Sequence, residues 1–303
     1  MNRVKSVHSM LALSGRAQSR LLRVSFTEQW VVGLARPKSS RLPTRLDVTE
    51  LLEPPPGSHF ADPFIISQGD KSYIYFEAWR NDNAKGTIWL SVVDAYGRCS
   101  QPELVLERPY HISYPFLFNW AGELFMLPET QHNHSIEIFR CMQFPTRWEL
   151  AATLMEGVDA VDSTLFQQGD RWWMFATGFG DTASKFQSLS LFAADCPFGP
   201  WRAHPHNPVV QDLGSARSAG RLFWHNGDLI RPGQDCRLRY GHSIAWNRVE
   251  VLNCSDYREI CIGRLKPAII NGWIAAHTFN QTGNWRVLDG KRLVRKLNTD
   301  RPA

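Results

Sequence analysis

The chain has 303 residues, of which 43% are hydrophobic and 12% aromatic, and its formal net charge is +5. A chain of this length can bury a large core. Its charges are mixed except at the two ends, which excludes the basic stripe of a nucleic-acid-binding protein, and its N-terminal apolar runs are too short for a signal peptide or a membrane span.

The first 28 residues are expected to form a basic N-terminal arm, with one folded domain over residues 29–303. No acidic residue precedes Glu28, whereas basic residues are spread through the segment. A basic, serine-containing segment without acids also has the composition of an organellar presequence, which is the alternative. We favour the arm.

Beyond the arm, residues 30–34 are a predicted strand, and residues 54–57 form a Pro-Pro-Pro-Gly break. A phrase that recurs about every fifty residues begins directly after this break. Each copy is a short apolar run, a turn that contains Gly, and a second apolar run. Four clear copies and a more divergent fifth copy begin at Asp62, Tyr114, Asp162, Gly220 and Leu265.

Each copy predicts a β-hairpin. A period of about 40 to 50 residues is typical of a β-propeller that has one four-stranded blade per repeat. Alternating apolar residues over 87–93, 136–140 and 189–194 predict outer strands of three blades. The sequence therefore predicts an all-β fold, a five-bladed β-propeller with a short N-terminal arm, in which residues 58–300 form one closed ring.

The six cysteines form no CxxC pair, so they indicate neither a zinc cluster nor a disulfide framework. Free thiols in a reducing compartment are expected, and we assign the protein to the cytoplasm. The histidines at positions 132 and 134 are an alternative metal site, but paired histidines in polar loops are usually ordinary loop residues. No metal and no cofactor are expected.

Alignment of the copies places acidic residues at two recurring positions. The starts of the first strands carry Asp62, Tyr114, Asp162, Gly220 and Leu265. The ends of the second strands, fifteen residues later in every copy, carry Glu77, Glu129, Thr177, Asp235 and Asn280. Equivalent positions of a propeller converge on its axis, so five carboxylates are expected there: Asp62, Glu77, Glu129, Asp162 and Asp235.

Such a cluster suits the cleavage of a glycosidic bond. That reaction needs one carboxylate that activates water and one carboxylic acid that protonates the leaving oxygen. A third acid nearby can keep the second one protonated by repulsion between like charges. We expect a glycan or glycoconjugate ligand, with substrate contacts from His59, Glu77, Trp79, His111, Tyr114, Arg217, Arg221, Gln234 and His277.

Structural roles compete with this interpretation. Asp62 precedes a proline and could simply form a turn, and Asp162 could form a side-chain-to-backbone turn with the serine and threonine that follow it. Arg217 and Arg221 could merely neutralise buried acids. At the level of the whole protein, a glycan-recognition module without catalysis and a scaffold for protein docking are the rival functions.

The chain also contains six motifs of a known group. They are His59-Phe60-Ala61-Asp62-Pro63-Phe64, Ser113-Tyr114-Pro115-Phe116, Pro128-Glu129, Asp162-Ser163-Thr164, Gly199-Pro200-Trp201 and Gln234-Asp235-Cys236. Over residues 28–293 the chain resembles the N-terminal domain of plant glucosamine inositolphosphorylceramide transferases and their bacterial relatives. That domain is similar in turn to the five-bladed glycosidases of the family 43 and family 32 type.

The resemblance implies roles for individual residues. It implies that Asp62 is the general base and that Asp162 tunes the general acid. A family 43 enzyme carries that acid, a Glu, after the second Asp, whereas here the fourth copy has Arg217 and Arg221 around Ser218-Ala219-Gly220. Glu129 and Asp235 are therefore the candidates for the acid. In the plant proteins glycosyl transfer belongs to a separate C-terminal domain, so a glycosyltransferase partner is a further expectation.

Overall fold

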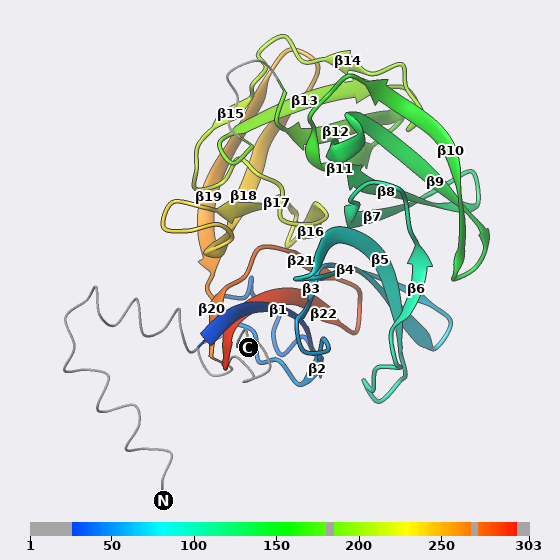
Figure 1. Ribbon diagram of the computed structural model, residues 1–303. Helices are drawn as coiled ribbons and strands as arrows, with labels where there is room; N and C mark the ends of the chain where they lie inside the picture. The colour runs from blue at the N-terminus through cyan, green and yellow to red at the C-terminus, as the bar shows by residue number, and fades with distance from the viewer. Residues whose placement is uncertain (1–25, 180–184, 268–271, 296–303) are drawn as a thin grey trace, which may run out of the picture.

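A computed structural model describes residues 26–179, 185–267 and 272–295 of the chain. Nearly all of the regular structure in these ranges is β-strand, in five antiparallel sheets that follow one another around a ring (Figure 1). The predicted five-bladed β-propeller is confirmed. Within the described ranges, no helix has the length and apolar character needed to cross a membrane.

Blades one to four are built from consecutive strands, with the first strand of each nearest the axis. Blade one contains β3 (Ser58–Gln68), β4 (Lys71–Arg80), β5 (Asn83–Val93) and β6 (Glu103–Leu106). Blade two contains β7 (Ser113–Trp120), β8 (Glu123–Thr130), β9 (Ser135–Gln143) and β10 (Arg147–Glu156). Blade three contains β11 (Val161–Gln168), β12 (Arg171–Thr177), β13 (Ser188–Ala194), β14 (Arg202–Ala203) and β15 (Val210–Gln211). Blade four contains β16 (Phe223–His225), β17 (Asp228–Asp235), β18 (Ser243–Leu252) and β19 (Tyr257–Leu265).

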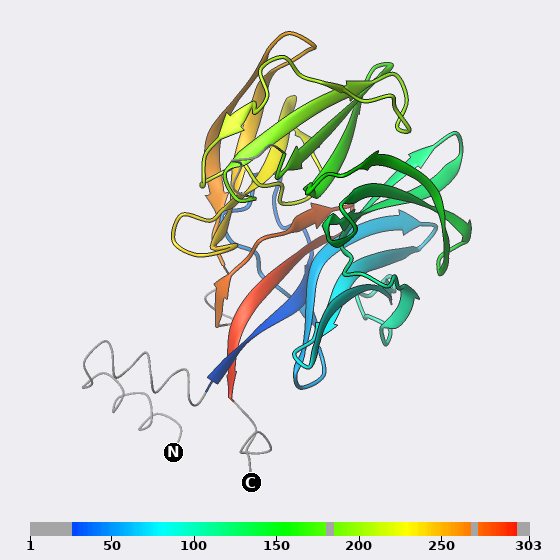
Figure 2. The same ribbon diagram turned by 45° about the horizontal axis from the view of Figure 1, so that its top comes forward.

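The fifth blade combines both ends of the described chain. Its inner strands are β20 (Trp273–Ala275), β21 (Phe279–Gln281) and β22 (Arg286–Arg295), and its outer strands are β1 (Phe26–Ala35) and β2 (Glu50–Leu52). Figures 1 and 2 both show β1 alongside β22. The predicted fifth copy is therefore misplaced, because Leu265 is the last residue of β19 in blade four. β1 also begins inside the segment that was expected to be an arm.

A β-bulge recurs in the innermost strands and directs side chains toward the axis. The residues at the start of the repeat have left-handed backbone, with φ of 50° at Asp62, 45° at Tyr114, 51° at Asp162 and 123° at Gly220. In blades one to three this residue lies where the strand pairing shifts register. A bulge bends the strand and changes the direction of its side chain. Such conformations are costly for non-glycine residues and are often retained at functional sites.

Aromatic residues fill the space between blades. Phe64 of blade one packs edge-on against Tyr114 and Phe116 of blade two, with ring centroids 4.8 and 5.8 Å apart. Glycine at position 220 permits a close backbone approach to blade five, because a Cβ there would lie 2.0 Å from the carbonyl oxygen of Phe279. All six cysteines are free thiols.

The Tyr114 hydroxyl joins blades two, three and four, which gives this predicted substrate contact a structural role. It accepts the Gly220 N–H at 2.8 Å and lies 2.9 Å from the Thr164 hydroxyl. Tyr114→Phe would leave the buried Gly220 N–H unsatisfied, so we expect a loss of about 1–3 kcal/mol in the free energy of unfolding. Urea unfolding would measure this loss, and Tyr96→Phe, at an exposed tyrosine, is the matched control. Equal stability of both variants would contradict the role.

Candidate active site

Asp62 is held at the junction of blades one and five. One carboxylate oxygen accepts the Thr278 hydroxyl at 2.5 Å, and Nε2 of His277 lies 3.8 Å from the same oxygen. Asp62 is only 6% exposed. Burial, followed by the charge of Asp162, raises the pKa of Asp62 to about 7, although His277 acts in the opposite direction. This carboxyl can therefore gain or lose a proton near neutral pH.

Asp289 fixes this junction, and the sequence did not reveal it. Its Oδ1 accepts the N–H groups of His277 and Thr278 at 2.9 and 3.0 Å, and its Oδ2 accepts the N–H of Asp62 at 3.0 Å. His277 Nδ1 forms an ion-pair contact with the same Oδ2. Burial lowers the pKa of His277, but the charges of Asp289 and Asp62 outweigh it, so that the pKa is raised.

The same arrangement occurs between blades two and three. Glu129, at the end of β8, accepts the N–H of Asp162 at 3.3 Å, as Asp289 accepts the N–H of Asp62. In both places an acid on the second strand of one blade accepts the N–H of the left-handed residue that starts the next blade. Asp289 is thus the blade-five counterpart of Glu129, at the place that the sequence alignment gave to Asn280.

Asp162 is paired with groups from blade four. Arg217 Nε lies 2.5 Å from its Oδ2 and Arg217 Nη2 lies 3.3 Å from its Oδ1, while Gln234 Nε2 donates to Oδ2 at 3.1 Å. Asp162 is 2% exposed. Two of the predicted substrate contacts, Arg217 and Gln234, therefore hold a candidate catalytic acid in place.

Glu129 lies beside this pair with little access to solvent, since its side chain is 10% exposed. Burial and then the neighbouring Asp162 charge raise the pKa of Glu129 to about 8, although Arg217, 3.8 Å away, acts against this rise. At neutral pH the Glu129 carboxyl is mainly protonated. A buried carboxylic acid next to an ionic pair has the character of a proton donor.

The structure does not bring Asp235 to this cluster. Asp235 accepts hydrogen bonds from Arg237 and Arg264, at 2.7 and 2.9 Å to its Oδ2. Burial raises its pKa, but the hydrogen bonds from Arg237 outweigh burial, so that the pKa is lowered. Its neighbour Gln234 donates to Asp162 instead.

The residues brought together around Asp62 and Asp162 form what we call the axial cluster, namely Asp62, Glu129, Asp162, Arg217, Gln234, His277 and Asp289.

Aromatic side chains from blades three, four and five border the cluster. Trp30 of β1 stacks on His277 with ring centroids 4.2 Å apart, and Tyr240 meets the edge of His277 at 5.1 Å. Arg217 lies 5.3 Å above the Tyr240 ring and 5.4 Å above the Phe186 ring. Tyr240 and Phe186 are 36% and 37% exposed, so they can reach a ligand from solvent. The sequence reasoning missed them because they lie in connections outside the repeat.

The remaining predicted contacts lie on blades one, two and four. Glu77 pairs with His111 at 3.1 Å. His59 stacks on Trp79 with ring centroids 4.5 Å apart, accepts the Trp30 N–H at 3.3 Å, and binds Asn81 at 2.7 Å. The Arg221 guanidinium lies 4.7 Å above the Phe116 ring and donates to the Leu117 carbonyl oxygen, and among the described residues it forms no ion pair with an acid. Burial lowers the pKa of Arg221 to about 10.

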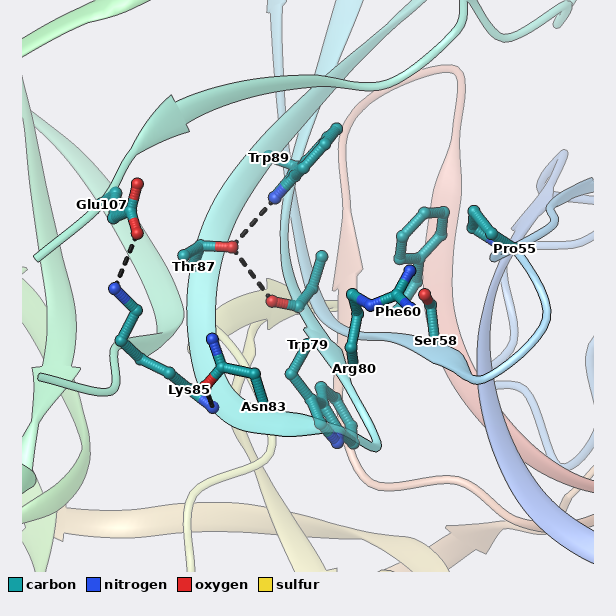
Figure 3. Close-up of a pocket in the computed structure, with 11 residues that line it drawn as sticks. Pro55, Ser58, Phe60, Trp79, Arg80, Asn83, Lys85, Thr87, Trp89 and Glu107 are labelled. Atoms are coloured by element: carbon teal, nitrogen blue, oxygen red, sulfur yellow. Dashed lines mark hydrogen bonds and ion pairs between the residues drawn. The ribbon is translucent and has the colours of Figure 1, made fainter. Parts of the chain in front are cut away.

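A cavity of about 270 Å³ on blade one includes Trp79 in its wall. Figure 3 shows Trp79, Trp89 and Phe60 around one space, with the Lys85–Glu107 ion pair at its side. Its aromatic walls suit the apolar face of a sugar ring.

Asp62, His277 and Asp289 bring three possible metal ligands within 4.8 Å of one another. Both oxygens of Asp289 already accept hydrogen bonds from backbone N–H groups, and Asp62 Oδ1 accepts the Thr278 hydroxyl. Asp289 and one oxygen of Asp62 are therefore already engaged in hydrogen bonds within the protein.

Comparisons with known proteins agree with this architecture. Residues 45–273 match the family model described as glucosamine inositolphosphorylceramide transferase 1, N-terminal. Glucosamine inositolphosphorylceramide transferase 1 of Arabidopsis thaliana is 34% identical over 211 residues, which is 68% of this chain and 27% of that protein. The protein of the same name from Oryza sativa subsp. japonica is 33% identical over 209 residues, which is 68% of this chain and 28% of that protein. The chain thus spans little more than a quarter of these relatives.

Solved structures resemble the protein at lower sequence identity. A family 117 glycoside hydrolase of Zobellia galactanivorans has a TM-score of 0.55 at 13% identity, covering 86% of this chain and 90% of that one. A β-1,3-galactosidase of family GH43 has a TM-score of 0.54 at 15% identity, covering 71% of this chain and 48% of that one. This likeness shows the fold alone.

Proposed function

We propose the following function for this chain, which belongs to the family of the N-terminal domain of glucosamine inositolphosphorylceramide transferase 1. Its axial cluster binds a glycan or glycoconjugate and supplies the acid and the base that cleave a glycosidic bond. The observation that carries this proposal is one buried cluster of carboxyl groups, in which Glu129 accepts the N–H of Asp162 and the charge of Asp162 acts on both Asp62 and Glu129. Burial and this charge raise the pKa of Asp62 to about 7 and that of Glu129 to about 8.

In this proposal Glu129 is the general acid. It gives its proton to the glycosidic oxygen as the bond between that oxygen and the anomeric carbon breaks. Asp62 takes a proton from the water whose oxygen bonds to the anomeric carbon. Asp162 is a positioning residue: its charge helps to keep the proton on Glu129, and Arg217 and Gln234 hold it in place.

The surroundings support glycan binding. Tyr240 and Phe186 offer partly exposed aromatic faces beside the acids, and Trp79 offers another in the blade-one cavity. Aromatic faces stack on the apolar faces of sugar rings, and acids and amides bind their hydroxyl groups.

The second candidate function is glycan recognition without catalysis, in support of a glycosyltransferase. Arg217 favours it, because blade four presents this cation to the axis where the glycosidase pattern calls for an acid. The names of the curated relatives describe a transferase, of which this chain matches little more than a quarter. In this case the acids are hydrogen-bond acceptors for hydroxyl groups.

A screen of glycans and glycosidase substrates tests the proposal. With wild-type protein we expect turnover of one substrate class, and with Asp62→Asn a loss of at least about 10²-fold in kcat while binding remains. Asp70→Asn, at an exposed acid of the β3–β4 turn, is the matched control and should keep full turnover. If wild type and Asp62→Asn both bind the glycan without turning it over, the protein is a recognition module and the proposal of an enzyme is wrong.

A further inference from the structure

A basic cavity of about 350 Å³ lies in blade five, at the Arg286 end of β22. The β1–β2 connection forms most of its wall, and Arg286, the first residue of β22, completes it. Its cationic members are Arg36, Lys38, Arg41, Arg45 and Arg286. The single acid in the wall is Asp47, and Asp47 is paired with Lys38.

Arg286 is the least accessible of these cations. It is 8% exposed, and its hydrogen bonds are long, at 3.4 Å to the Gln281 side-chain oxygen and 3.4 Å to the Ser39 carbonyl oxygen. Among the described residues, no carboxylate lies within ion-pair distance of it. Burial alone lowers the pKa of Arg286. A buried charge without a counter-ion is destabilising unless something else neutralises it.

The other cations leave the cavity positive. Arg36 donates to the Ala95 carbonyl oxygen at 2.9 Å and stacks 4.0 Å above the Trp285 ring, so it too has a neutral partner. For Arg41 and Arg45, both exposed, the described part of the chain provides no ion-pair partner. Four guanidinium groups thus surround one space that contains no free acid.

The wall is held in place by the body of the propeller. Trp246 of β18 donates to the Pro43 carbonyl oxygen at 2.8 Å, and the Lys266 N–H donates to the Thr44 carbonyl oxygen at 3.0 Å. Leu42 and Leu46 pack into the hydrophobic core between blades four and five. A loop anchored in this way keeps its arginines together without a ligand, which lowers the entropic cost of binding.

We propose that this cavity binds a phosphate ester or sulfate ester group, with Arg286 as the buried anchor and Arg41 and Arg45 at the entrance. Guanidinium groups bind such oxyanions through paired hydrogen bonds, and an oxyanion would supply the counter-charge that Arg286 lacks. This site is separate from the axial cluster and does not depend on the function proposed for it. The anion can come from a soluble phosphate or from the headgroup of a lipid.

Inorganic phosphate is the first probe, because it contains the shared chemistry alone. We expect phosphate to raise the melting temperature of the wild-type protein more than chloride of equal ionic strength does. Arg286→Met should abolish the phosphate effect while its own melting temperature without phosphate is equal to or above that of wild type, since a buried unpaired charge is removed. Arg45→Gln should weaken phosphate binding about tenfold.

Arg202→Gln, at an exposed arginine of β14, is the matched control and should respond to phosphate like wild type. Vesicles of phosphatidylcholine with phosphatidic acid distinguish the source: sedimentation lost in Arg286→Met assigns a lipid headgroup, and binding of phosphate without sedimentation assigns a soluble anion. No phosphate effect in wild type, or an equal effect in all variants, would overturn the proposal.

Discussion

Asp289→Ala is expected to destabilise the propeller by about 5 kcal/mol or more, because each buried N–H left without an acceptor costs about 1–3 kcal/mol. Three such groups, from Asp62, His277 and Thr278, lose their acceptor at once. The His277 ring also loses its ion-pair partner. Such a loss approaches the whole stability of many domains, about 5–15 kcal/mol. Urea unfolding followed by tryptophan fluorescence would measure it.

Asp289→Asn should lie between wild type and Asp289→Ala. Its amide oxygen can still accept two N–H groups, but its NH₂ group would face the Asp62 N–H. Asp70→Ala, at an exposed aspartate, should change stability by less than about 0.5 kcal/mol. If Asp289→Ala unfolded within about 1 kcal/mol of wild type, these hydrogen bonds would not hold the junction.

Glu129→Gln is expected to lower kcat by about 10³–10⁴-fold on a substrate that the wild-type protein cleaves, because an amide cannot deliver the proton. The active form needs Asp62 ionised and Glu129 protonated. Asp62 ionises as the pH rises through about 7, and Glu129 loses its proton as the pH rises through about 8. Activity should therefore peak between these values and fall on both sides.

The pH profile also separates acid catalysis from structural damage. Glu129→Gln removes the group responsible for the alkaline limb, so its residual activity should keep the acidic limb and lose the alkaline one. A substrate whose leaving group needs no proton should recover most of its rate in the variant. An unchanged bell-shaped profile in Glu129→Gln would show that another group is the acid.

From the sequence, the repeat correctly predicted the fold and the first of the two recurring positions that were expected to face the axis, the start of the first strand of each blade. The four residues assigned to the start of the first strands in blades one to four all have left-handed backbone, namely Asp62, Tyr114, Asp162 and Gly220. The repeat could be recognised because blades one to three share the same bulge and all four copies have a hairpin turn, and these features constrain both residue type and spacing.

The second position, at the end of the second strand, was predicted less well. A fixed spacing of fifteen residues fails where a strand is one residue shorter or longer. In blade four, one residue fewer separates Gly220 from the turn at Asn226 and Gly227 than separates Asp62 from its turn. This shift brings Gln234 to the axis and turns Asp235 toward Arg237. A shift of one residue reverses the side of a strand to which every side chain points.

The fifth blade was misplaced for a different reason. Its outer strand β1 precedes all the other blades in sequence, and its inner strand is interrupted between β20 and β21. Neither feature is visible from the spacing of the earlier copies. A fixed spacing could not find Asp289 either, because it is the fourth residue of β22, whereas Glu77 and Glu129 are the seventh residues of β4 and β8.

Closure of the ring by β1 and β22 constrains how the protein is made. Glu28 and Lys291, which form an ion pair across this seam, are 263 positions apart in the sequence. Pairings of such high contact order form slowly. On the ribosome, β1 emerges before every other strand of the propeller and can pair only with the short strand β2 until β22 has been translated, while blades one to four can fold as they leave the exit tunnel. We therefore expect nascent chains that stop short of β22 to expose the edge of β1 and to be the species that chaperones bind.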